Sequence, residues 1–387
     1  KISFTAPFLL VPELPSERRD RMKRLVIMTL CLILVTGVCA FAEETVTRFT
    51  YESALETAVE NSIQPELDDY NIKSLESALE KAKEEAIKGF IGGTSQEVVE
   101  RKIIKQVAPF EAEVNLEVAK RQKEDNIKQI KADVYQEMMR VLIAEDSIEI
   151  KKKKVELLEE KYEIDLKRFG EGLISQAEIN DEELALAVER LELKNMETAL
   201  ASDILNIKKR LHVDLSDDNK IEFDYELQKI GTHYVLDIFN IEEAILKAKE
   251  TNTTVYQKKK ALEAAEMKLE ITKQHLKPGH DFYDQKVYEL EKAKKELYDA
   301  EADLEASIRN AYNELMTALD ALELANKREE LENSRLETLK IKFNAGVISR
   351  RDMIDNELSL LDKKLATLQA ISDFNIKTDI LRSLIEN

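Results

Sequence analysis

The sequence predicts an all-α protein built from two tandem repeats of long antiparallel coiled-coil helices, with a short β segment linking the repeats. Composition is the first reason: 35% of the 387 residues are charged, with nine Gly, six Pro and no Trp, which is typical of long helices. Internal repetition is the second. Phe169–Ser175 (FGEGLIS) returns 174 residues later as Phe343–Ser349 (FNAGVIS), and each copy interrupts a helical pattern. One unit therefore occurs twice.

Residues 1–42 are expected to lie outside the working protein. A basic start at Met22–Arg24 precedes an apolar run, Leu25–Val38, and a small-x-small site at Ala40–Ala42. This order is typical of a secretory signal peptide, with an uncleaved anchor as the alternative. Residues 1–21 are interpreted as upstream of the natural start. Both cysteines fall inside the signal, so the mature chain is expected to have no disulfide.

The first repeat is assigned to residues 43–215. Apolar residues at spacings of three and four, together with Pro and Gly breaks, predict four helices: Tyr51–Asn61, Glu66–Lys88, Pro109–Phe169 and Gln176–Leu211. Alternatively, the third helix begins earlier, near Ser95, with a kink at Pro109.

A linker, residues 216–240, follows, and Lys220–Tyr225 alternates in polarity like a short edge strand. The second repeat, 241–387, is expected to repeat the order of the first. Its predicted helices are Ile241–Glu250, Thr253–Leu276, Asp281–Phe343 and Arg350–Ile385.

Helix lengths indicate how each repeat packs. In both repeats the second and fourth helices together match the length of the third, so two short helices can stack along one long helix. At 1.5 Å per residue, each repeat would be an antiparallel pair of roughly 90 Å. Such a pair leaves a second apolar stripe exposed. Lateral association, usually into closed rings, is therefore expected.

The chain order, the two Gly-x-x-Ser turns and the opening segment Tyr51–Asn61 (YESALETAVEN) together resemble the TolC family of outer-membrane efflux proteins. The similarity covers about Phe49–Asn387. It implies a homotrimer of helices around a tunnel, in the outer membrane and periplasm of the cell envelope. The expected partners are a periplasmic adaptor (a membrane fusion protein) and an inner-membrane transporter that supplies the energy.

In that family the glycine-containing turns form the tip that contacts the adaptor. Carried over to this sequence, the tip residues are Gly172, Leu173, Ser175, Gly346, Val347 and Ser349. The alternative is purely structural, because Gly permits a tight reversal and Ser caps the next helix. Both roles can hold together.

Two carboxylates follow the second turn, Asp352 and Asp355, on one helical face. The resemblance implies that they line the tunnel entrance, where rings of carboxylates favour cations. Glu178 and Asp181 are their counterparts in the first repeat. The alternative is that acidic residues simply favour the first turn of a helix.

The sequence also departs from the family. Residues 89–108 and 277–284 are too short to hold the paired membrane strands that the family inserts there, so membrane contact stays open. Some members close the tunnel with an arginine where this chain has Ile348, and the nearest bases are Arg350 and Arg351.

Other classes of function are disfavoured. The net charge of −19 argues against nucleic acid as a partner. Four scattered histidines offer no metal-ligand spacing, and no catalytic motif or cofactor-binding loop occurs. The chain is therefore not expected to be an enzyme. The alternative to an efflux duct is a structural scaffold of the cell envelope, a rod without a lumen, which the missing membrane strands would favour.

Overall fold

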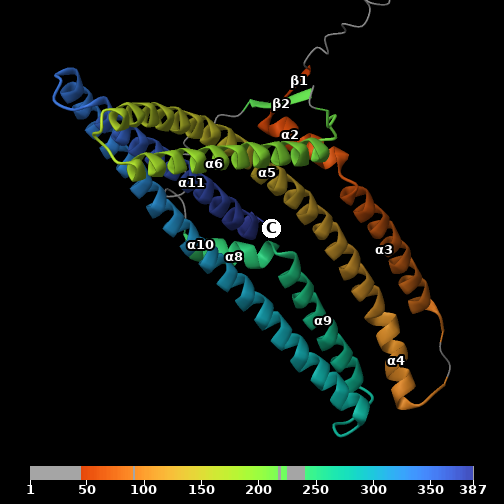
Figure 1. Cartoon of the computed structure of the whole chain (residues 1–387). Coiled ribbons are helices and arrows are strands. Elements are labelled where there is room, and N and C mark those ends of the chain that lie inside the picture. The colour runs from red at the N-terminus through yellow and green to blue at the C-terminus, as the bar shows by residue number, and fades with distance from the viewer. Residues whose placement is uncertain (1–44, 90–91, 217–218, 225–239, 387) are drawn as a thin grey trace, which may run out of the picture. The chain divides into compact units, whose positions relative to one another are not determined.

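The computed structural model describes residues 45–89, 92–216, 219–224 and 240–386, so the expected signal peptide lies outside the described residues. The chain divides into a small unit, residues 1–47 and 216–220, and a large unit, residues 48–215 and 221–387. All of the helices discussed below belong to the large unit (Figure 1). The predicted all-α fold with two helical repeats and a short β segment is confirmed.

The first half of the chain begins with a strand that sequence reasoning did not predict. The elements are β1 (Thr45–Thr50), α2 (Tyr51–Asn61), α3 (Gln64–Ile87), α4 (Ser95–Gln106), α5 (Ala108–Gly170) and α6 (Gln176–Arg210). Thr50 ends the strand and caps α2, because its hydroxyl accepts a hydrogen bond from the Ser53 amide.

Before α5, helical structure begins at Ser95, where the second prediction places it, but as a separate helix, α4, and not as a kinked extension of α5. α4 begins at a capping box of Thr94 and Glu97. It ends at Val107, and Pro109 occupies the first turn of α5. Proline is tolerated there because the missing amide hydrogen would have no partner inside the helix.

The second half repeats this order except for α4. Its elements are β2 (Asn219–Asp224), α8 (Ile241–Thr251), α9 (Thr253–Lys273), α10 (Asp281–Asn344) and α11 (Arg350–Glu386). β2 confirms the strand predicted in the linker and pairs with β1 in a two-stranded sheet. Within the large unit, Arg48 of β1 forms an ion pair with Glu222 of β2 at 2.9 Å.

The short helices pack along the long ones, as their lengths predict. α3 and α6 both lie along α5, and α9 and α11 both lie along α10 (Figure 1). Apolar clusters hold both groups together. One contains Ile308, Leu315 and Phe374 of the second repeat, and another contains Met138 and Ile207 of the first.

The two repeats also contact each other through α5, which packs against α11 and α9. α5 therefore has a neighbour from its own repeat and a neighbour from the other repeat along its length. This position explains why α5 carries the polar contacts described next.

Candidate functional site

The two glycine turns have the same backbone hydrogen bonds. In the first, the Gly172 amide donates to the Phe169 carbonyl and the Leu173 amide donates to the Arg168 carbonyl, both at 2.9 Å. Gly346 and Val347 repeat this pattern at the end of α10, also at 2.9 Å. It is the Schellman arrangement, which requires a left-handed residue after the helix. Gly172 (φ 75°) and Gly346 (φ 71°) supply that residue.

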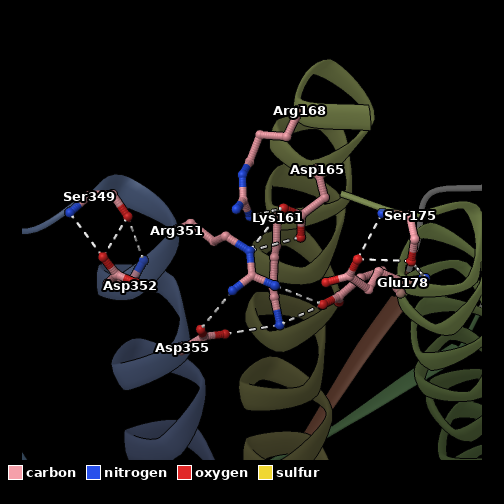
Figure 2. A network of polar contacts seen from close by, with 10 residues as sticks. Lys161, Asp165, Arg168, Ser175, Glu178, Ser349, Arg351, Asp352 and Asp355 are labelled. Atoms are coloured by element: carbon pink, nitrogen blue, oxygen red, sulfur yellow. Dashed lines mark hydrogen bonds and ion pairs between the residues drawn. The ribbon is translucent and has the colours of Figure 1, made fainter. Parts of the chain in front are cut away.

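A serine caps the helix that follows each turn. The Ser175 amide donates to Glu178 Oε2 at 2.7 Å, and the Glu178 amide donates to Ser175 Oγ at 3.3 Å. Ser349 and Asp352 reproduce this box at 3.1 and 3.2 Å (Figure 2). The hydrogen bonds from Ser175 hold the pKa of Glu178 below its ordinary value, and those from Ser349 do the same for Asp352.

The turns present apolar side chains to solvent. Leu173 is 64% exposed and Val347 is 70% exposed. Gly172, Ser175, Gly346 and Ser349 are exposed as well. The structural role predicted for the glycines and serines is therefore present, and an accessible apolar residue lies in each turn. Contact of these six residues with an adaptor stays a prediction.

Arg351 joins the beginning of α11 to α5 and α6. Its Nε lies 2.9 Å from Asp165 Oδ1 on α5, and its Nη2 lies 3.2 Å from Glu182 Oε1 on α6. Asp165 is only 1% exposed and also pairs with Arg168 at 2.8 Å. Burial alone would raise the pKa of Asp165, but its hydrogen bonds to Arg351 and Arg168 outweigh burial and lower it. Figure 2 shows Arg351 reaching across to α5.

Two lysines of α5 make similar bridges, one helical heptad apart. Lys161 Nζ lies 3.1 Å from Glu182 of α6 and 2.9 Å from Asp355 of α11. Lys154 Nζ lies 2.7 Å from Glu189 of α6 and 2.8 Å from Asp362 of α11.

Ion pairing also controls the charge of these two lysines. Burial alone would lower the pKa of each, but the hydrogen bonds to its two carboxylates outweigh burial and raise it. Each lysine therefore connects three helices from both repeats while it stays charged.

Arg350 adds a further connection between the repeats. Its guanidinium binds Glu160 of α5 through two contacts of 2.7 Å and reaches Glu357 of α11 at 3.1 Å. Such two-point pairing fixes orientation as well as distance. Arg350 and Arg351 are the bases identified from the sequence as nearest to Ile348. Ile348 itself packs against a small apolar cluster of Leu336, Met353 and Leu360.

The four predicted tunnel carboxylates are in different environments within the chain. The carboxylates of Glu178 and Asp352 accept hydrogen bonds from the amides of the capping serines. Asp355 binds Lys161 and lies 3.6 Å from Arg351. Asp181 is exposed on α6. Lining of a tunnel by these residues stays a prediction.

Sequence reasoning missed the bridging groups on α5 and α6, namely Lys154, Lys161, Asp165, Glu182 and Glu189. A signal for them exists, because the two lysines are seven residues apart, as are Glu182 and Glu189 and also Asp355 and Asp362. Residues seven apart lie on one face of a helix, so matched heptads on three helices indicate bridges.

No helix among the described residues is long and apolar enough to cross a membrane. The described residues also contain no group of three or more His, Cys, Asp or Glu side chains placed to hold a metal ion.

Comparison with solved structures identifies the fold. CusC, described as forming a transmembrane channel, superimposes with a TM-score of 0.65 at 9% identity, over 87% of this chain and 91% of its own. The outer membrane protein VceC of Vibrio cholerae gives 0.62 at 10%, over 86% and 95%. The Campylobacter jejuni outer membrane channel CmeC gives 0.61 at 11%, over 87% and 85%.

The comparisons with models of protein families and with curated proteins found no match. The solved structures confirm the predicted resemblance to the TolC family for the fold, over 86 to 87% of this chain.

Proposed function

We propose that this protein is a TolC-like efflux duct of the cell envelope, with its place at the outer membrane and in the periplasm. One observation carries the proposal: the fold matches outer-membrane channels over 86 to 87% of this chain and 85 to 95% of theirs. The function would be passive conduction, because energy comes from a partner transporter.

In this proposal three copies assemble around a central tunnel, and the turns at Gly172–Ser175 and Gly346–Ser349 contact a periplasmic adaptor. The exposed side chains of Leu173 and Val347 support the second part, since exposed apolar groups at a tip favour contact with another protein. An inner-membrane transporter would complete the pathway.

The ion pairs suggest how the tip is held. Arg350 and Arg351 connect the beginning of α11 to Glu160 and Asp165 of α5. We propose that these pairs keep the α10–α11 pair against the α5–α6 pair in a closed state. Asp352 and Glu178 would then line the entrance from their positions at the helix starts.

Molar mass tests the assembly. The full chain is purified with and without detergent, and its mass is measured by light scattering after size exclusion. Three copies per particle would support the duct. A monomer in both conditions would overturn it and favour the envelope scaffold.

Adaptor contact needs a separate test in cells that supply the partner transporter. Leu173→Asp and Val347→Asp should reduce export while leaving the molar mass unchanged, because both side chains are exposed. Export equal to wild type would contradict contact at these turns. Lys327→Asp, at an exposed position of α10 outside the turns, is the control.

A further inference from the structure

The long helices of the two repeats have different surroundings near the turns. α5 packs along α6 on one side and along α11 on the other, whereas α10 packs along α11. Among the helix pairs with extended contact in the described part of the chain, α6 is paired only with α5. α5 and α11 are neighbours from different repeats. Their counterparts, α10 and α6, have no such neighbour from the other repeat in this region among the described helices.

The repeat can be aligned residue by residue in this region, at the spacing of 174 set by the turns. The faces that form each hairpin have buried or half-buried residues at corresponding positions in both repeats. On α6 and α11, buried or half-buried positions 179, 182, 186, 189 and 193 correspond to 353, 356, 360, 363 and 367. On α5 and α10, positions 148, 151, 155, 158 and 162 correspond to 322, 325, 329, 332 and 336.

The second faces of α11 and α6 differ. On α11 a second stripe is buried or half-buried, and it consists of Ile354, Leu358, Leu361 and Leu365. Leu358 packs against the apolar cluster that Val155 and Leu158 of α5 form with Leu186 of α6. The aligned residues of α6 are Asn180, Leu184, Ala187 and Leu191, and all four are exposed. Leu184 and Leu191 are 64% and 59% exposed, although apolar residues are retained there.

α5 and α10 show the same difference. The stripe of α5 on this side is half-buried and consists of Ile150, Lys154, Leu157, Lys161 and Ile164. The aligned stripe of α10 is fully exposed and has nearly the same chemistry: Leu324, Arg328, Leu331, Arg335 and Thr338. An apolar and basic face that binds a helix in one repeat is thus present and uncovered in the other.

We propose that α6 of a second copy of this chain covers this face of α10, in the arrangement that α11 has on α5 within one chain. Within one chain, Lys161 of α5 and Asp355 of α11 form an ion pair at 2.9 Å. The aligned residues on α10 and α6 should form the same pair between two copies. Arg335 of one copy binds Asp181 of the next. The inference rests on the assembly of copies in the proposed function, and it assigns Asp181 to the interface between them.

Charge supports this pairing. Arg335 keeps the positive charge of Lys161, and Asp181 keeps the negative charge of Asp355. Arg335 is 65% exposed, and its nearest carboxylate, Glu332 of its own helix, is 3.9 Å away. The other bridge is not repeated, because Asp362 aligns with Val188. Asp181 and Arg335 are therefore the pair to test.

The halves of the repeats away from the turns give independent support. Here α9 packs on α5 as well as on α10, whereas α3 has extended contact with α5 and α4 among the described helices. At the spacing of 190 set by the Ala54 and Ala244 motifs, buried Thr253 and half-buried Lys260 of α9 align with exposed Ile63, directly before α3, and with exposed Tyr70 of α3. The same edge is thus uncovered at these two positions as well.

Charge reversal with rescue tests the proposal. Asp181→Arg and Arg335→Asp each place like charges across the proposed interface, and the double variant restores opposite charges. We expect each single variant to raise the dissociation constant of the assembly about tenfold per interface, or roughly 1.4 kcal/mol, and the double variant to recover most of it. Light scattering over a dilution series measures all three. Helix content by circular dichroism verifies folding, and Lys327→Asp, whose counterpart Lys153 is exposed, is the matched control.

Rescue is diagnostic because α6 and α10 lack extended contact within one chain, so the two substitutions can compensate only between copies. A wild-type trimer whose single variants dissociate without rescue in the double variant would overturn this interface and leave the duct standing. Single variants that assemble like wild type would overturn it too. A monomeric wild type would overturn both.

Discussion

α5 and α10 are the same element of one repeat, with 63 and 64 residues, yet one lies between two neighbours and the other at an edge. α5 buries charged groups, among them Lys151 and Asp165. Their aligned positions on α10 are Ala325 and Leu339. Asp165 connects the two hairpins through Arg351 of α11, and Lys151 pairs with Glu189 of α6 inside its own hairpin. The edge helix has uncharged residues at both aligned positions.

Removal of the most deeply buried charge should have the largest effect. Asp165→Leu gives α5 the leucine that α10 has at the aligned position 339, and it leaves Arg351 and Arg168 without their shared carboxylate. We expect a loss of about 3 kcal/mol in the free energy of unfolding, measured by denaturant titration. Asp165→Asn, which keeps an acceptor oxygen, should lose less. Wild-type stability in Asp165→Leu would show that the pair does not hold the hairpins together.

Acid should weaken the α5 connections. The hydrogen bond from Arg350 lowers the pKa of Glu160. For Glu189, burial alone would raise the pKa, but hydrogen bonds from Lys151 and Lys154 lower it overall.

A carboxyl group whose pKa is lowered by folding contributes its full stabilisation above the pKa of the unfolded chain, and that contribution is lost as pH falls towards the folded value. Those unfolded values are 3.8 for Asp165 and 4.5 for Glu160 and Glu189. The free energy of unfolding should therefore decline as pH falls below about 4.5. The free energy of unfolding of Asp165→Leu should decline less steeply with falling pH than that of the wild type. Identical slopes for wild type and variant would argue against a role of Asp165 in this dependence.

Substitution of the turn glycines should reduce stability least, and by the same amount in both repeats. Gly172→Ala and Gly346→Ala put a side chain on left-handed backbone, where nothing lies within 4 Å of the added carbon. Backbone strain alone then costs about 1 kcal/mol at each turn. Thermal unfolding of the two variants should agree within error. A much larger loss at one turn would mean that the turns are not equivalent.

Much of the fold follows from the sequence because it depends on local signals. The repeat of FGEGLIS as FNAGVIS, the helix periodicity and the glycine turns are all contained in short segments. β1 was missed although Thr45–Thr50 is rich in β-branched residues, because it directly follows the expected signal peptide and its partner strand β2 is distant in the sequence.

The candidate site could be predicted only in part. The turns and caps at Ser175 and Ser349 are local, so sequence places them. The bridges of Lys161 and Arg351 connect three helices that are distant in sequence, and a single chain shows them only once the helices are packed. The exposed stripes of α6 and α10 cannot be recognised from the sequence, because their apolar residues resemble those that are covered on α11 and α5.

End-on projection images of the purified assembly test the central claim most directly. Cryo-electron microscopy of particles viewed along their long axis would show whether the helices enclose a lumen. We predict three-fold symmetry with a central low-density channel. Particles with a solid centre, or with no rotational symmetry, would contradict the account of this protein as a duct.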